Sequence, residues 1–477
     1  MLHLPILRAG QPYKSLDTME LTHVRTGKAV ARVSQASGGL IARDLSKAAE
    51  HRRALQALSV AELLEICRKA SKLFAEADLP VDPADGVMQT PEEYVVTLSS
   101  TTGMPQSLCR ANMEKIRFVL AEMETVLGGL TRGLDLSVLD AGWATQDGRP
   151  LCFVGCADTL GAVLPSNSPG VHSLWLPAIP LKAPLALKPG SREPWTPMRV
   201  AQAFIVAGCP AEAFGFYPSD YSGATEILMR SDRSMLFGDE STVRGWREDR
   251  RVQIHGPGWS KVLLDEAAAG EWERHVELMV TSIAENGGRS CLNASGVWLP
   301  SNGRRVAGAL AERLAAIEAR PLDDPEARIA AFSEPAIAHR ISNVIDDGLA
   351  VPGAEDLTAP LRTGDRVVEL DGCTFLLPTL IWCEDPEHPL AASEFLFPFA
   401  SVVEVPRNEM PRRIGSTLVA TAVTEDAMFK SELLAARNID RLNLGACPTS
   451  RVSWDQPHEG NLFEHLYRQR ALQSQTA

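Results

Sequence analysis

The stretch that decides the fold is APLALKPGSREPWTPMRVAQAFIVAGCPAEAFGFYP, residues 183–218. Its first eight residues, 183–190, form an apolar run that ends in a Pro-Gly pair, which predicts a strand followed by a turn. A helical pattern then covers 197–208 and is closed by a glycine, and a second strand is predicted at 213–218. Because a crossover helix joins the two strands, we expect them to lie parallel in an α/β sheet.

The same alternation continues along the chain. Apolar runs at 234–239 and 251–258, with a helical pattern before the first, predict two further strands. Parallel sheets bind nucleotides at the carboxyl ends of their strands. A dinucleotide site is therefore expected near Lys188, Gly238 and Gly256, although the chain contains no GxGxxG sequence, the usual fingerprint of such a site.

The first 140 residues are predicted to be mostly helical. Apolar residues recur three and four positions apart at 59–77 and at 112–130, which is typical of helices packed on one face. An Asp-Gly turn signal then predicts a hairpin over 143–166. After the predicted sheet, a second α/β region is expected over 262–440.

The composition limits the classes of function. The chain has 477 residues, 45% of them hydrophobic and 22% charged, so it is long enough for two or three domains with large cores. A net charge of −13 argues against nucleic acid as a partner, and no apolar run approaches a membrane span of about 20 residues. The nine cysteines are scattered, without metal-site spacing, so no metal and a reducing, cytoplasmic location are expected.

Five segments, in the same order along the chain, resemble motifs of the aldehyde dehydrogenase superfamily. They are LPSNSPG (164–170), LALKPGSREPWTP (185–197), MLFGDESTVRGW (235–246), ENGGRSCLNAS (285–295) and SEFLFPFASVVEV (393–405). The resemblance covers roughly residues 20–465.

The resemblance implies an α/β fold of three parts. These are a Rossmann-like dinucleotide-binding domain (1–142 and 159–261), a second α/β catalytic domain (262–440), and a small β oligomerisation extension (143–158 and 441–477). An edge strand of the extension is expected to pair across subunits, so a homodimer or homotetramer is predicted.

Chemistry and resemblance agree on Cys291. A thiolate attacks an aldehyde, and loss of a hydride to a nicotinamide leaves a thioester on the enzyme. The resemblance assigns the stabilisation of the oxyanion to the side-chain amide of Asn167 and to the Cys291 backbone N–H. The alternatives are a buried structural cysteine and a turn-forming asparagine.

The resemblance also implies NAD or NADP as cofactor. Lys188 matches the lysine that contacts the adenosine ribose, and Glu394 matches the glutamate that binds the nicotinamide ribose. Ser191 replaces an acidic residue found in members that favour NAD, and Arg192 follows it, so a 2′-phosphate is expected to be tolerated. Gly238 matches the first glycine of the pyrophosphate turn.

Some positions depart from the family pattern. Val243 stands where the second glycine of the pyrophosphate turn is expected, and Leu396 replaces a phenylalanine. Hydrolytic members carry Glu-Leu-Gly-Gly-Lys where this chain has a sequence beginning at His255, and their glutamate activates the water that releases the acid. The segment GPGWSKVLLDEAA (256–268) instead resembles CoA-acylating aldehyde dehydrogenases.

The missing glutamate affects water more than a thiol. Water has a pKa near 15.7 and needs a positioned base, whereas a thiol with a pKa of about 8.5 is partly ionised at neutral pH. A base is worth about 10² to 10⁴ in rate. The leading interpretation is therefore an enzyme that interconverts an acyl-CoA and an aldehyde with NAD(P)H through a Cys291 thioester, with coenzyme A as co-substrate.

Two other interpretations stay open. A hydrolytic aldehyde dehydrogenase would release a free carboxylic acid, with His255 as a substitute base rather than a structural residue. A non-catalytic nucleotide-binding or assembly protein on the same scaffold would account for the departures at Val243 and Leu396.

Overall fold

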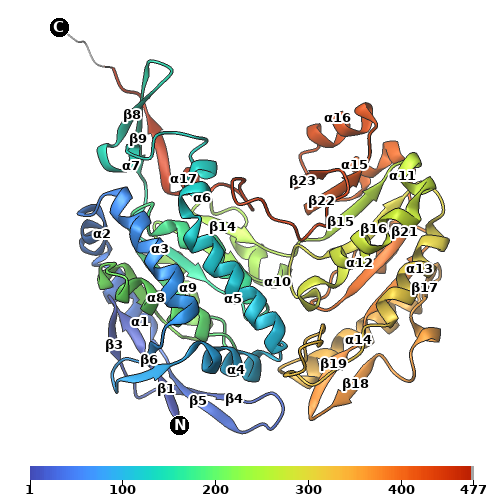
Figure 1. The fold of residues 1–477 in the computed structure, drawn as a ribbon, viewed down its shortest axis with the longest axis horizontal. Helices are drawn as coiled ribbons and strands as arrows, with labels where there is room; N and C mark the ends of the chain where they lie inside the picture. The colour runs from blue at the N-terminus through green and yellow to red at the C-terminus, as the bar shows by residue number, and fades with distance from the viewer. Residues whose placement is uncertain (474–477) are drawn as a thin grey trace.

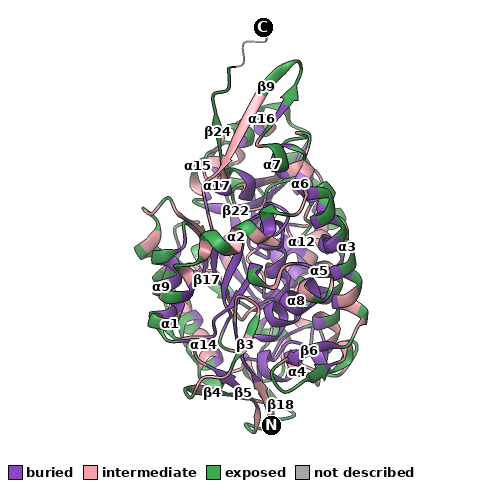
Figure 2. Ribbon diagram, turned by 90° about the vertical axis from the view of Figure 1, so that its left-hand side faces the viewer, coloured by how far each residue is buried: buried purple, intermediate pink, exposed green. Residues whose placement is uncertain are grey.

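The computed structural model describes residues 1–473 and has two lobes, each built on its own seven-stranded sheet (Figure 1). The first lobe contains the N-terminal half of the chain and the last residues of the tail. The second lobe contains the residues between them. Buried residues concentrate in the sheets and on the inner faces of the helices, and the outward faces of the helices are exposed (Figure 2).

The sheet of the first lobe confirms the predicted parallel arrangement. Four parallel pairings join β14 to β13, β13 to β10, β10 to β11 and β11 to β12, and helices connect consecutive strands. The strand order is β14-β13-β10-β11-β12-β2-β3. The strands are β10 (Leu160–Val163), β11 (Leu185–Lys188), β12 (Phe214–Phe216), β13 (Arg233–Phe237), β14 (Val252–His255), β2 (Ile6–Arg8) and β3 (Gln11–Tyr13).

The helices of the first lobe begin where the sequence offers caps. Ser59 and Glu62 form a capping box at the start of α3, and the predicted helix at 59–77 is confirmed. The helix predicted at 112–130 is split at Glu122 into two helices. The helices are α1 (Gly38–Leu45), α2 (Ala48–Gln56), α3 (Val60–Glu76), α4 (Pro91–Thr102), α5 (Gln106–Ala121), α6 (Met123–Leu130), α7 (Val138–Ala141), α8 (Trp195–Val206), α9 (Tyr221–Arg230) and α10 (Glu240–Val243).

The prediction of a mostly helical N-terminus is wrong for residues 1–34. These residues form strands because their apolar side chains are buried against the sheets: Leu4, Ile6 and Leu7 have no exposed surface. Strand β2 pairs antiparallel with β12 and extends the parallel sheet. The other strands within residues 1–34 are β1 (Leu2–Leu4), β4 (Thr18–Thr22) and β5 (Ala29–Ser34). A separate pair of strands, β6 (Leu79–Asp82) and β7 (Val87–Gln89), follows α3.

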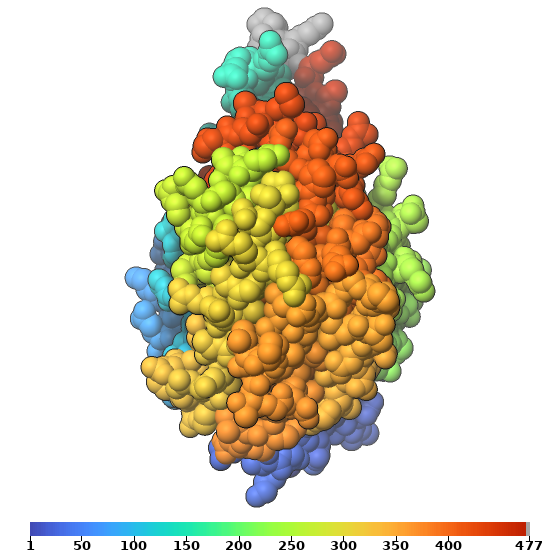
Figure 3. All heavy atoms as spheres, turned by 90° about the vertical axis from the view of Figure 1, so that its right-hand side faces the viewer, coloured from blue at the N-terminus to red at the C-terminus, as the bar shows by residue number. Residues whose placement is uncertain are grey.

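The second lobe is also built on a parallel sheet, in the order β17-β20-β21-β16-β15-β22-β23, with only β17 antiparallel. Its residues cover most of the face seen in Figure 3. The strands are β15 (Ser260–Leu264), β16 (Ala294–Leu299), β17 (Ala354–Asp356), β20 (Thr379–Cys383), β21 (Phe399–Glu404), β22 (Thr417–Val423) and β23 (Ile439–Leu444), with a separate hairpin of β18 (Val367–Leu370) and β19 (Cys373–Leu376). The helices are α11 (Glu266–Gly270), α12 (Val276–Ala284), α13 (Gly303–Ala315), α14 (Pro335–Leu349), α15 (Met410–Arg413) and α16 (Ala427–Ala435).

A small three-stranded sheet projects from the first lobe. The predicted hairpin forms β8 (Trp143–Gln146) and β9 (Arg149–Gly155), joined by Asp147 and Gly148 at positive φ. It ends there, because β10 belongs to the main sheet. The tail returns through α17 (Leu462–Leu466) and β24 (Tyr467–Arg470), which pairs antiparallel with β9. No helix in the described part of the chain is long and apolar enough to cross a membrane.

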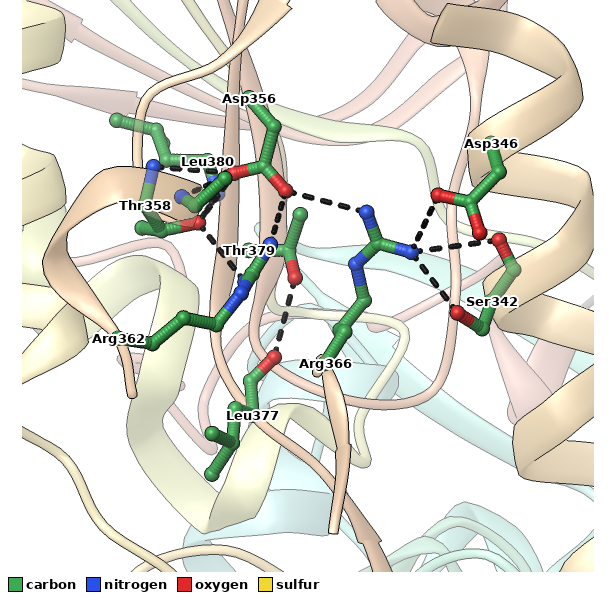
Figure 4. A network of polar contacts seen from close by, with 10 residues as sticks. Ser342, Asp346, Asp356, Thr358, Arg362, Arg366, Leu377, Thr379 and Leu380 are labelled. Atoms are coloured by element: carbon green, nitrogen blue, oxygen red, sulfur yellow. Dashed lines mark hydrogen bonds and ion pairs between the residues drawn. The ribbon is translucent and has the colours of Figure 1, made fainter. Parts of the chain in front are cut away.

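A buried polar network stabilises the second lobe at its β17 edge (Figure 4). The carboxylate of Asp356 accepts hydrogen bonds from the backbone N–H and the hydroxyl of Thr358, at 3.0 and 2.5 Å. The guanidinium groups of Arg362 and Arg366 pair with the same carboxylate, and Arg366 also reaches Asp346 on α14. Burial opposes ionisation, but Thr358 and Arg362 hold the pKa of Asp356 below its ordinary value.

Asp356→Ala is expected to destabilise the protein by about 3–5 kcal/mol, because the buried guanidinium of Arg362 loses its counter-ion and that of Arg366 keeps only Asp346. Chemical denaturation measures this, with the exposed Asp365→Ala as control. Since the folded-state pKa is depressed, the stabilisation is complete above the unfolded-state pKa of about 3.9 and is lost as the pH falls through the folded-state value. An unfolding midpoint equal to that of the control would contradict the assigned role.

Candidate active site

The short segment 256–259 connects the first sheet to the second. Strand β14 ends at His255 on the carboxyl edge of the first sheet, where the register also places Phe237 and Lys188. Five residues later, β15 begins at Ser260, at the amino edge of the second sheet. The sequence 256–259 therefore links the predicted nucleotide edge of one sheet to the amino edge of the other.

Cys291 lies at this junction, just before β16. Helix α12 ends at Ala284, and three consecutive residues, Asn286, Gly287 and Gly288, then take positive φ values and reverse the chain. A side chain on Gly288 would overlap the backbone of Phe397, so this turn packs tightly against the segment before β21. The glycine pair is thus needed for close packing of the cysteine turn.

The turn is fixed against the crossing segment. The Ser260 hydroxyl donates a hydrogen bond to the Cys291 carbonyl at 2.9 Å. A Cβ atom on Gly258 would overlap that same carbonyl oxygen. Among residues 1–473 no group accepts a hydrogen bond from the Cys291 N–H, so this donor is available to a developing oxyanion.

Gly258→Ala is expected to lower turnover by about 10²-fold or more, because the added methyl group must displace the nucleophile's backbone. The rate of cofactor reduction at saturating aldehyde measures this effect. Gly245→Ala is the matched control, since no heavy atom lies within 4 Å of its added Cβ. Equal rates for the two variants would show that the contact with Cys291 does not matter.

Cys291 opens into a cavity of about 390 Å³ between the lobes. The pKa of its thiol is raised by burial and by the charges of Glu459 and Glu394, with the Lys115 ammonium opposing them. The thiol is therefore protonated at rest and requires a proton acceptor to become a nucleophile. The cavity is lined by residues of α5, of the segment 168–174, of the cysteine turn and of the tail: Leu108, Ala111, Asn112, Lys115, Ser168, Gly170, Val171, Ser173, Leu174, Phe237, Glu285, Asn286, Ser290, Cys291, Leu292, Asn293, Ser450, Val452, Trp454, His458 and Glu459.

His255 does not line this cavity. Its ring is buried and stacked on Phe237, with the ring centroids 4.3 Å apart. Its Nδ1 pairs with the carboxylate of Glu459, and its Nε2 is buried without a partner among residues 1–473. Two carboxylates, those of Glu285 and Glu459, line the cavity with Cys291, and the sequence analysis missed Glu459.

Asn167 lies beside the cysteine turn, and its side-chain amide Nδ2 donates a hydrogen bond to the Arg289 carbonyl at 2.7 Å. Nearer the cavity, Asn112 donates to the side chain of Asn286 at 2.7 Å, and Asn286 donates to the Ser168 hydroxyl at 3.0 Å. This chain of amides holds the positive-φ turn against α5. It was not predicted, because the sequence carries no signal that pairs residues so far apart.

The other predicted cofactor residues lie at the carboxyl edge of the first sheet or next to it. Lys188 ends β11, and burial lowers the pKa of its amine although Asp220 opposes the shift. Ser191 is exposed. Arg192 is engaged between the lobes, because it donates to Thr22 and forms an ion pair with Glu334, each at 3.2 Å.

The turn that was predicted to bind the pyrophosphate is closely packed at Gly238 and Val243. A side chain on Gly238 would overlap Thr242 within the same turn, and Val243 is fully buried. Gly256 is more open, because a Cβ atom added there would have its nearest neighbouring atom 3.5 Å away. The Lys188 amine, the Ser191 hydroxyl and the Gly256 backbone N–H are donors suited to the ribose and phosphate groups of a ligand along this edge.

Glu394 contacts the segment 256–259. Its carboxylate accepts hydrogen bonds from the backbone N–H groups of Gly258, at 3.1 Å, and of Trp259. Burial raises the pKa of Glu394 to about 7, despite those two donors and the nearby Lys261. In this structure Glu394 fastens the crossing segment to the second lobe.

The fold and the site define a two-lobed α/β protein with a cysteine at the junction of its sheets. The chain belongs to the aldehyde dehydrogenase family, whose model, described as "Aldehyde dehydrogenase family", matches residues 12–411. This confirms the family and fold expected from the sequence; the CoA-acylating subtype is not shown.

Solved structures share the fold over nearly the whole chain. The aldehyde dehydrogenase KauB from Pseudomonas aeruginosa is similar with a TM-score of 0.77 and 17% identity, covering 99% of this chain and 96% of its own. An NAD-dependent aldehyde dehydrogenase from Sinorhizobium meliloti has a TM-score of 0.77 and 16% identity, with coverages of 98% and 94%. An NADP dependent enzyme of E. coli has a TM-score of 0.78 and 16% identity, with coverages of 98% and 97%.

Proposed function

We propose that this protein is an NAD(P)-dependent aldehyde dehydrogenase that oxidises an aldehyde to a free carboxylic acid through a thioester on Cys291. The observation that carries the proposal is the carboxylate of Glu459, which lines the same cavity as Cys291 and is held by His255. Glu459 is proposed to replace the glutamate of the hydrolytic motif. The absence of that glutamate was the reason for expecting coenzyme A as co-substrate. The leading interpretation from the sequence is thereby replaced by its hydrolytic alternative.

Glu459 is the proton acceptor in both halves of the proposed cycle. It first accepts the proton of the Cys291 thiol, and the resulting thiolate attacks the aldehyde carbonyl. The Cys291 N–H and the free amide hydrogen of Asn167 are the donors proposed for the oxyanion. Glu459 then releases the thiol proton to solvent, and in the second half of the cycle it takes a proton from water; the resulting hydroxide attacks the thioester carbonyl and expels the Cys291 thiolate. His255 keeps the carboxylate in place.

The proposed cofactor site is the carboxyl edge of the first sheet. Lys188, Ser191 and Gly256 would contact the ribose and phosphate groups, and Gly238 would shape the turn beside them. When bound, the nicotinamide supplies the hydride acceptor that the oxidation requires. Acceptance of a 2′-phosphate by Arg192 requires its ion pair with Glu334 to open, so NADP is proposed as a tolerated cofactor rather than the preferred one.

A CoA-acylating enzyme is the second candidate, favoured by one observation: the position that ends β14 carries His255, followed by a Gly-Pro-Gly sequence, rather than a glutamate. In that case a thiol would attack the thioester in place of water. The comparisons give this subtype no support, since the similar structures are described as aldehyde dehydrogenases without reference to coenzyme A.

One experiment separates the candidates. Purified protein is incubated with a panel of aldehydes and NAD or NADP, with and without coenzyme A, and acid and acyl-CoA are quantified. Acid formation at the same rate without coenzyme A supports the proposed function. Strict dependence on coenzyme A would establish the second candidate, and no nicotinamide reduction with any aldehyde would point to a non-catalytic scaffold protein.

The three-stranded sheet of β8, β9 and β24 is proposed as the oligomerisation element. Strand β8 is an edge of this sheet and carries the half-exposed Trp143, so it is available to pair with a second copy. Of the predicted segments, 143–158 contains β8 and β9 and 441–477 contains β24, but residues 441–444 belong to β23 of the second lobe, so the proposed element is limited to the strands of this small sheet. Light scattering that finds a monomer at micromolar concentration would contradict the predicted homodimer or homotetramer.

A further inference from the structure

The cavity that holds Cys291 contains one unpaired cation. Lys115, on α5, is the only lysine or arginine among the described residues that line it. Other lysines form ion pairs, such as Lys14, Lys182 and Lys430. None of residues 1–473 places a carboxylate within the 4.0 Å of an ion pair to Lys115.

The ammonium of Lys115 is positioned by its neighbours. It lies 5.5 Å from the ring centroid of Trp454, over the ring face. A Cβ atom added to Gly170 would lie 3.4 Å from Nζ, so the amine is also near that glycine. Trp454 and Gly170 line the same cavity as Lys115 and Cys291.

The acidic residues of the cavity are already engaged. Glu459 pairs with His255, and Glu285 accepts a hydrogen bond from the Ser450 hydroxyl. Burial lowers the pKa of the Lys115 amine, and Cys291, when it is ionised to the thiolate, and the Glu285 carboxylate oppose the shift. A cation in a partly dehydrated cavity, without a paired carboxylate, is most stable when a ligand brings the counter-ion.

We propose that the substrate is an aldehyde that carries a carboxylate at its far end, and that the Lys115 ammonium binds this carboxylate while Cys291 attacks the carbonyl. The inference rests on the proposed function for the aldehyde, but the anion site itself is independent of it. A neutral aldehyde of the same length leaves Lys115 without a counter-ion, so it is the poorer substrate.

Alkylation of Cys291 tests the anion site without any turnover. Iodoacetate carries a carboxylate and iodoacetamide is its neutral isostere; the rate constants for modification of Cys291 by each are followed by peptide mass spectrometry. Their ratio cancels any change in the reactivity of the thiol, because both reagents meet the same thiol. Lys115→Met is expected to lower the iodoacetate to iodoacetamide ratio about 10-fold or more, the effect of one charge-assisted hydrogen bond.

Two further variants control the measurement. Lys115→Arg keeps the charge and is expected to retain the ratio within about 3-fold. Lys69→Met makes the same substitution at an exposed lysine of α3 and is expected to leave the ratio unchanged. If Lys115→Met leaves the ratio within about 2-fold of wild type, the anion site is overturned, even if both rate constants fall together.

Turnover then tests the substrate class. We expect 4-oxobutanoate to exceed butanal in kcat/KM by about 10-fold or more in the wild type, and Lys115→Met to remove this preference mainly by weakening the carboxylated substrate. Oxidation of both aldehydes with no preference would overturn the inference and leave the proposed function standing. Failure to oxidise any aldehyde, with the alkylation ratio still dependent on Lys115, would instead reject the proposed function and keep the anion site.

Discussion

Cys291→Ala is expected to reduce aldehyde oxidation by at least about 10⁴-fold, the largest effect of any substitution considered. Without the sulfur no covalent adduct forms, so neither water nor a thiol has a thioester to attack. Binding of the nicotinamide cofactor is expected to survive, since the proposed cofactor residues lie on the other sheet. Initial rates of cofactor reduction and a fluorescence titration with the cofactor measure the two properties on the same preparation.

Cys447→Ala is the matched control for that substitution, because Cys447 is also a free, partly exposed cysteine and does not line the cavity. It is expected to keep wild-type activity. If Cys291→Ala retained activity within about 10-fold of the control, the nucleophile would have to be another residue.

Glu459→Gln is expected to lower the rate of acid release by about 10² to 10⁴, because glutamine cannot accept a proton from water. Because Glu459 is also the proposed acceptor of the thiol proton, thioester formation slows as well, and intact mass spectrometry is expected to show little adduct on Cys291. Glu464→Gln, further along the same tail and exposed in an ion pair with Arg132, provides the control. Unchanged acid release in Glu459→Gln would remove Glu459 from the mechanism.

His255 provides an internal check on the same idea. In His255→Ala the carboxylate of Glu459 loses its partner but stays in the chain, so acid release is expected to fall less than in Glu459→Gln. A larger loss of acid release in His255→Ala would indicate that the imidazole itself is the base. That is the hydrolytic alternative stated in the sequence analysis. Coenzyme A added to Glu459→Gln gives a further reading: restored turnover would show that a thiol reaches the thioester.

The sequence predicted the parallel strands at 185–255 well because their information is local, whereas β10, between β11 and β13, was assigned to the hairpin. Each strand there is a short apolar run closed by glycine or proline, and each helix has the matching periodicity. The strands at residues 1–34 were missed for the opposite reason. Their pairing partners lie far away, as when β2 pairs with β12, and burial against that partner outweighs weak local preferences.

The candidate site divides in the same way. Cys291 and Gly258 could be found because each stands in a distinctive local sequence. Glu459 and Lys115 could not, since one lies in a polar tail and the other on an amphipathic helix, where a charged residue is usually solvated. Each of them lies beside a residue that is far away along the chain, and only the folded structure shows that the two are close.

The two lobes are joined by two connecting segments of chain, and both pass through the active site. One is the crossing segment at 256–259; the other is the tail between β23 and α17, which carries Trp454 and Glu459. A rigid-body opening of the cleft would move His255 and Glu459 with the first lobe and Cys291 with the second. The proposed base and the nucleophile therefore belong to different lobes, and their proximity depends on how these two segments hold the lobes together.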